Sequence, residues 1–122
     1  MRKERWVAFA LILALILVGC STLKQDQRYS NSGFDELSKG NYPKAEEHLK
    51  KALEANPNNP YALLNMGVVY QNTGRKVQAR KMYEKVLSLE EGLKNKTARR
   101  SNKDWARGET LGAVAKRHLD TL

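Results

Sequence analysis

The stretch GVVYQNTGRKVQA at residues 67–79 decides the fold of this chain, because the earlier stretch GFDELSKGNYPKA at residues 33–45 has its small residues at the same places: Gly33, Gly40 and Ala45 superpose on Gly67, Gly74 and Ala79. The two stretches lie 34 residues apart, and their glycines coincide. The match continues downstream, where Leu49, Ala52 and Leu53 superpose on Tyr83, Val86 and Leu87. A period of about 34 residues with a glycine midway is typical of two packed helices joined by a turn. The sequence therefore predicts an all-α fold with an internal repeat.

The small residues of the repeat have physical roles in such a fold. Gly67 and Ala79 are small where the two helices of one unit would press together. Gly40 and Gly74 stand where a helix would end and the chain reverse, a position that favours left-handed backbone. The cluster NPNNP at residues 56–60 is rich in turn-forming residues. We expect it to end one unit and to start the next.

Large and small residues alternate through the second unit, residues 60–93, in the order Met66, Gly67, Tyr70, Ala79, Tyr83 and Val86. With the period, this pattern resembles the tetratricopeptide repeat (TPR) family. The first unit, residues 26–59, is similar in its second half, but Ser32 and Glu36 stand where the family has larger apolar residues. In the second unit, Glu91 replaces the usual proline. The resemblance implies two TPR-like helix-turn-helix repeats and a protein that binds.

Repeats of this family bind extended peptides or partner helices in a groove lined by the first helix of each unit. Carried over by position, the partner-binding groove of the second unit consists of Tyr61, Leu64, Asn65, Val68, Gln71 and Asn72. The same face of the first unit offers Ser30, Asn31, Phe34 and Leu37. Packing against other helices is the alternative role for the apolar members, because apolar residues on helices are usually core. The carboxylate clamp of some family members is not expected, since only Asn65 matches its positions.

The N-terminus has the layout of a secretory signal. Basic residues at 2, 3 and 5 precede an apolar run over residues 6–18. The sequence LVGC at 17–20 looks like the lipobox of bacterial lipoproteins, which implies cleavage before Cys20 and lipidation of its thiol. A retained membrane span is the alternative, but thirteen helical residues extend only about 20 Å, against a hydrocarbon core of roughly 30 Å. We expect a signal peptide at 1–19, and several acyl chains on Cys20 would make a lasting anchor.

Charge and cysteine content narrow the class of protein further. The full chain has a formal net charge of +9, and Cys20 is its one cysteine, so an internal disulfide is excluded. From residue 93 to 122, eight Lys/Arg stand against three Asp/Glu, whereas residues 26–91 are nearly balanced. Such a basic tail suggests contact with anionic lipid or a polyanion, with a solvated surface as the alternative. The basic segment consists of Lys94, Lys96, Arg99, Arg100, Lys103 and Arg107.

The C-terminal residues follow a helical pattern. Apolar residues recur at helical spacing from Leu111 to Leu122, and we interpret residues 110–122 as a capping helix on the open end of the second unit. Docking on a partner or on the membrane surface is the alternative. The predicted organisation is a signal peptide at 1–19, the lipidated cysteine and a tether at 20–31, two TPR units over 26–93, a basic linker at 94–109 and the capping helix at 110–122.

Catalysis is not expected from this sequence. The two histidines, His48 and His118, have no neighbouring nucleophile or carboxylate at a recognisable spacing. We interpret His48 as an exposed polar residue and His118 as flanking the apolar face of the last helix. No phosphate-cradling glycine loop is present. We expect no cofactor and no metal, apart from the covalent lipid on Cys20.

These observations predict a non-catalytic, membrane-anchored TPR lipoprotein that acts as an interaction adaptor or assembly factor in the bacterial envelope. Its partner would be a protein or peptide, and nucleic acid is not expected. Two repeats are few for a continuous core, so a homo-oligomer is a further expectation. An aspartate after the lipidated cysteine favours the inner membrane in lipoproteins, and Ser21 stands there instead, so we expect the outer membrane, facing the periplasm. The alternative is an envelope protein that binds anionic lipid or polyanion through the basic segment.

Overall fold

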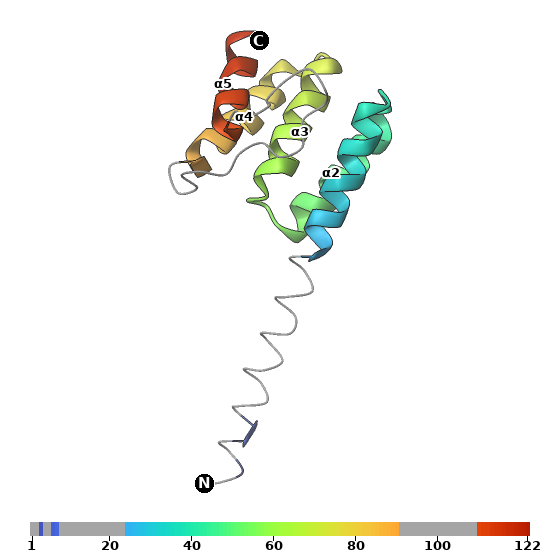
Figure 1. Ribbon diagram of the computed structural model, residues 1–122, viewed down its shortest axis with the longest axis vertical. Helices are drawn as coiled ribbons and strands as arrows, with labels where there is room; N and C mark the ends of the chain where they lie inside the picture. Colours follow the sequence, from blue (N-terminus) through green and yellow to red (C-terminus); the bar gives the residue numbers. More distant parts are fainter. Residues whose placement is uncertain (1–2, 4–5, 8–23, 91–109) are drawn as a thin grey trace.

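A computed structural model describes residues 3, 6, 7, 24–90 and 110–122 of the chain. Residues 24–38 form a first helix, which is followed by four labelled helices. These are α2 (Tyr42–Ala55), α3 (Pro60–Asn72), α4 (Lys76–Glu90) and α5 (Leu111–Asp120). The helices pack side by side, with α3 between α2 and α4 and with α5 against α4 and α3 (Figure 1). The predicted architecture of two helix-turn-helix repeats and a C-terminal helix is confirmed.

The turns within the two repeats have the same hydrogen bonds, 34 residues apart. Gly40 and Gly74 adopt left-handed backbone, with φ of +75° and +77°. The next residue donates its N–H five residues back, from Asn41 to the Glu36 carbonyl at 2.9 Å and from Arg75 to the Tyr70 carbonyl at 2.8 Å. This pattern is the Schellman motif, in which a glycine accepts a backbone conformation that a Cβ would strain. The shared glycines therefore end the first helix of each repeat.

Asparagine or threonine side chains cap the N-termini of α2, α3 and α5. The side chains of Asn41, Asn59 and Thr110 each accept a hydrogen bond from an N–H in the first turn of α2, α3 and α5. A proline follows in the first turn of α2 and of α3, where a missing N–H costs no helical hydrogen bond. These caps explain why the polar NPNNP cluster ends one repeat and starts the next.

In the core, a small residue on one helix leaves room for a large side chain on the next helix. Tyr83 of α4 is fully buried and lies so close to Gly67 that a Cβ there would overlap its ring. In the first repeat, a Cβ on Gly33 would lie 2.6 Å from the Leu49 side chain. The apolar face of α5 continues this core, because Val114 and Ala115 are fully buried. The glycines at the start of the repeated stretches thus let the two helices of each unit approach closely.

The first helix extends into the region predicted as a tether. Residues 26–31 were predicted both as part of the tether over 20–31 and as the start of the first unit, and residues 24–31 are helical, so the tether assignment is wrong for them. The reason is a buried carboxylate: Asp26 is 2% exposed and accepts hydrogen bonds from the side chains of Asn56 and Asn59, both at 2.9 Å. Asp26 therefore ties the start of the first helix to the turn between the repeats. In the part of the chain that the structure describes, no helix is both long and apolar enough to cross a membrane.

Candidate functional site

Two hollows lie beside the helix over 24–38 and α3, and Tyr42 of α2 and His118 of α5 also line the second. The first has a volume of about 210 Å³ and is lined by Gln27, Ser30, Asn31, Phe34, Asn59, Tyr61 and Asn65. The second, about 280 Å³, is lined by Phe34, Leu37, Ser38, Tyr42, Val68, Asn72 and His118. Phe34 borders both, so we treat them as one concave groove. Each hollow is smaller than the roughly 300–1,000 Å³ of a small-molecule site, and their size suits single side chains of a peptide.

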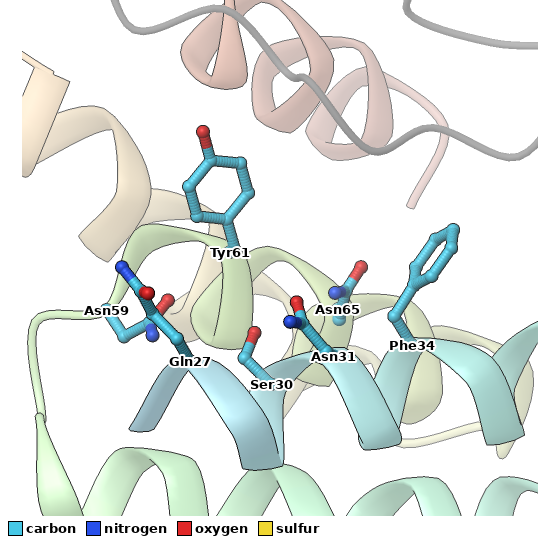
Figure 2. A pocket seen from close by; sticks show the side chains of 7 residues that line it. All are labelled: Gln27, Ser30, Asn31, Phe34, Asn59, Tyr61 and Asn65. Atoms are coloured by element: carbon cyan, nitrogen blue, oxygen red, sulfur yellow. The ribbon is translucent and has the colours of Figure 1, made fainter. Parts of the chain in front are cut away.

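The first hollow is lined mainly by amides and a hydroxyl. Figure 2 shows that the side chains of its lining residues come from the first helix on one side and from α3 and its cap on the other. Asn65 is 8% exposed, and no described group hydrogen-bonds its side-chain amide. An amide carries both donors and an acceptor, which match the N–H and C=O of an extended peptide. The hollow can therefore hold a peptide backbone.

The floor of this hollow is held by a hydrogen-bond network. Asn59 uses both ends of its amide, because its Nδ2 donates to Asp26 at 2.9 Å and its Oδ1 accepts from the Ala62 N–H at 3.0 Å. Asn59 is itself 4% exposed. The network joins the first helix, the turn between the repeats and the start of α3. It fixes the positions of the two helices that carry the lining side chains.

The residues predicted from the second repeat divide into two groups. Tyr61 and Asn65 line the first hollow, and Val68 and Asn72 line the second. Leu64 is 5% exposed and packs in the same core cluster as Leu111 and Val114. Gln71 is half-buried, and its side chain accepts a hydrogen bond from the Tyr83 hydroxyl. Of the apolar residues, Tyr61 and Val68 therefore line the groove, whereas Leu64 packs in the core. Both roles that the sequence left open, groove lining and helix packing, occur.

A polar cluster docks α5 at the far end of the groove. Gln71 Oε1 accepts from the Tyr83 hydroxyl at 2.8 Å and lies 2.9 Å from Nδ1 of His118. The rings of Tyr83 and His118 stack with centroids 5.1 Å apart. Burial, with a smaller contribution from Arg117, lowers the pKa of His118. The ring is therefore neutral at pH 7 and belongs to the α5 contact.

The sequence predictions reached the first-unit residues Ser30, Asn31, Phe34 and Leu37, all of which line the groove. They missed Gln27 and Asn59 in the first hollow and Ser38, Tyr42 and His118 in the second. Gln27 lies one turn before Ser30 and Asn31, so a correct helix start would have placed it on this face. Asn59 was assigned only to the turn, and its position as the α3 cap, three residues before Ala62, was the available signal.

The groove carries no formal charge in the described structure. None of the residues that line the two hollows is Lys, Arg, Asp or Glu. A site for a carboxylate terminus or a phosphorylated peptide would need cationic donors. The lining therefore favours an uncharged segment with apolar side chains beside Phe34 and Tyr61.

Other predicted sites lie outside the described residues or differ from expectation. Cys20 and the basic segment over 94–107 belong to the residues that the structure does not describe. His48 is half-buried and stacks on Tyr29 at a centroid distance of 6.4 Å, whereas the sequence suggested an exposed residue. Within residues 24–90 and 110–122, no group of three His, Cys, Asp or Glu side chains could hold a metal ion.

The fold and the two hollows define a helical-repeat protein with a groove beside its first helix and α3. A protein-family model described as tetratricopeptide repeat matches residues 36–92, which include α2, α3 and α4. Residues 36–92 of this chain therefore carry tetratricopeptide repeats. No solved structure matches it significantly.

Curated relatives share part of the chain. The photosystem I assembly protein Ycf3 of Synechococcus sp. (strain CC9605) is 39% identical over 51 residues, which is 42% of this chain and 30% of the relative. Ycf3 of Prochlorococcus marinus is 34% identical over 58 residues, 48% of this chain and 34% of the relative. The uncharacterized protein ycf37 of Pyropia yezoensis is 36% identical over 72 residues, 59% of this chain and 39% of the relative. The chain spans less than two fifths of the length of each of these relatives.

Proposed function

We propose that this protein is a non-catalytic adaptor or assembly factor that holds a protein partner in the concave groove between the first helix and α3. The observation that carries the proposal is the Asn65 amide, which lies 8% exposed beside Phe34 and Tyr61 with no described hydrogen-bond partner. The partner segment would be extended and uncharged, with an apolar side chain in each hollow. Two of the relatives are named as photosystem I assembly proteins, which supports an assembly role of this general kind.

Site-specific photocrosslinking in living cells tests this proposal. A photoreactive amino acid replaces Asn31 in the groove, and a matched control carries it at Glu84, which is exposed on α4. Mass spectrometry then identifies the crosslinked proteins. We expect one or a few partners from position 31 that are absent from position 84. The same products from both positions would contradict a groove-based adaptor.

We also propose that the protein is anchored by lipid on Cys20 in the outer membrane of a bacterium, facing the periplasm. The support is the LVGC motif and Ser21 in the sequence. Metabolic labelling with palmitate should mark the wild type, whereas Cys20→Ala should stay unlabelled and uncleaved. Label in the Cys20→Ala variant would contradict lipidation at Cys20. Recovery of the wild type in the inner-membrane fraction would contradict the outer-membrane location.

The excess of basic residues from 93 to 122 favours a second candidate function, binding of anionic lipid or polyanion through the basic segment. Salt distinguishes the two candidates, because contacts between exposed charges weaken steeply as ionic strength rises and apolar contacts do not. Capture that disappears at high salt and ignores groove substitutions would favour the basic segment. Capture that resists salt would favour the groove.

A further inference from the structure

The first helix separates the groove from a third hollow. Gln27, Ser30, Asn31 and Phe34 face the groove, and residues 25, 28, 29 and 32 lie on the opposite side of the same helix. This hollow has a volume of about 370 Å³ and is lined by Lys24, Gln25, Arg28, Tyr29, Ser32 and His48. We call it the Lys24–His48 hollow. It is lined by the first helix and α2, and it shares no lining residue with the groove.

The polar groups of the Lys24–His48 hollow suit a negatively charged ligand. No acidic residue lines it, and no described carboxylate pairs with Lys24 or Arg28. Other cations nearby are neutralised, as Lys51 is by Glu47 at 2.7 Å. An unneutralised Lys and Arg one helical turn apart combine a point charge with a planar fork, which are the groups that bind phosphate.

A second observation concerns His48, in the wall of the same hollow. Its Nδ1 is buried, and no described group gives it a hydrogen bond. A buried polar atom without a partner is destabilising, so such atoms usually mark a site for water or a ligand. The Tyr29 ring stacks on His48 with ring centroids 6.4 Å apart, so the two aromatic residues form one side of the hollow.

We propose that the Lys24–His48 hollow binds a phosphate group through Lys24 and Arg28, with His48 and Ser32 completing the wall. The phosphate could come from free phosphate or from a phospholipid headgroup. The lipid source rests on the proposed anchoring, because Lys24 follows Cys20 by four residues and an extended linker of that length reaches at most about 14 Å. An anchored chain would hold the hollow close to the headgroups.

Histidine NMR on the full chain in uncharged maltoside micelles tests the phosphate site itself. Inorganic phosphate is titrated at constant pH and ionic strength while the ring signals of both histidines are followed. The His48 signals should shift to saturation, and those of His118, which contacts Gln71 and Tyr83 instead, should stay in place. Shifts in neither ring, or equal shifts in both, would overturn the proposal.

Two variants with the same change in net charge test whether phosphate binding depends on the Lys24–His48 hollow or only on the charge of the protein. Lys24→Gln/Arg28→Gln should weaken phosphate binding by about ten-fold or more, because both charged groups that would contact the phosphate are removed. Arg80→Gln/Lys81→Gln removes the same charge from exposed positions on α4 and should leave binding within about two-fold. Equal losses in both variants would overturn the proposal. Helical circular dichroism confirms that each variant is folded.

Nanodiscs distinguish the two sources of phosphate. The His48 signals should shift in discs that contain phosphatidylglycerol and should not shift in discs with equal charge from oleate. When free phosphate competes with phosphatidylglycerol, the signals should move to their positions in the free-phosphate complex. A shift with inorganic phosphate but not with phosphatidylglycerol supports the site and assigns it to soluble phosphate. A matching shift with oleate overturns it. Loss of Cys20 lipidation in cells would contradict the anchor and leave the micelle titration unaffected.

Discussion

At the scale of single residues, Gly67 decides how closely α3 and α4 pack. Gly67→Ala should lower the free energy of unfolding by about 1–3 kcal/mol or more, because the new Cβ would overlap the buried Tyr83 ring. Urea denaturation measures the loss. Gly74→Ala is the control, since nothing lies within 4 Å of its Cβ position and only backbone strain of about 1–2 kcal/mol is added at φ of +77°. A neutral Gly67→Ala variant would contradict the packing.

Glu46 makes the fold sensitive to acid. Its carboxylate lies 2.6 Å from Arg75 and 2.9 Å from Lys50. The hydrogen bond from Arg75, opposed by burial and helped by Lys50, lowers the pKa of Glu46 to about 2. Because this pKa is depressed on folding, the stabilisation is present above the ordinary value of 4.5 and is lost as the pH falls toward 2.

Glu46→Gln should therefore cost on the order of 1–2 kcal/mol at pH 7, with allowance for solvent screening. The difference from wild type should shrink as the pH is lowered from about 5 to 2.5, because the wild type then loses its own ion pair. Urea denaturation across this range measures both proteins. A difference that stays constant with pH would contradict the role of the ionised pair.

Residue roles set by local pattern were predictable, and those set by distant partners were not. The glycines at 40 and 74 follow from the turn geometry that the repeat demands. The Asp26 contacts join residues 30 and 33 positions apart, so no local pattern shows them. His48 was interpreted as exposed because the helical pattern of α2 does not show that Tyr29 stacks on it.

At the scale of the helices, α5 is part of the core. Leu111→Ala should lower the free energy of unfolding by about 2–5 kcal/mol, because Leu111 is 3% exposed in the cluster that α5 shares with α3 and α4. Hydrogen exchange should show faster opening of α4 and the end of α3. Lys116→Ala, on the exposed face of α5, is the control and should stay within about 0.5 kcal/mol. Equal effects would contradict the docking of α5.

The helices themselves were predictable, but their contacts were less so. The apolar spacing from Leu111 onward predicted α5, and the cap Thr110 marks its start. Leu64 was predicted to line the groove, but it packs against Leu111 and Val114 of α5 in the core. Its burial depends on where α5 docks, which the sequence does not show. The polar residues Gln25–Ser32 were predicted as a tether, although the first unit was placed from residue 26, because the local pattern does not show that Asp26 and Ser30 are buried.

At the scale of the whole molecule, α5 packs against α4 and α3 at the open end of the second repeat (Figure 1), and its His118 lines the second hollow of the groove. The position of the groove followed from the repeat pattern, because first helices of successive units lie side by side. Its amide lining and lack of charge required the structure, which shows the faces of both helices together. The lipid anchor stays a prediction from the sequence.

The dissociation constant of the protein partner identified by crosslinking tests the central claim most directly. It is measured for the wild type and for Phe34→Ala/Asn65→Ala, which empties the middle of the groove. Arg80→Gln/Lys81→Gln is the control on the exposed side of α4. The groove account predicts a loss of about ten-fold or more for the groove variant, as for central residues of an interface, and no change for the control. An unchanged dissociation constant in a folded groove variant would contradict it.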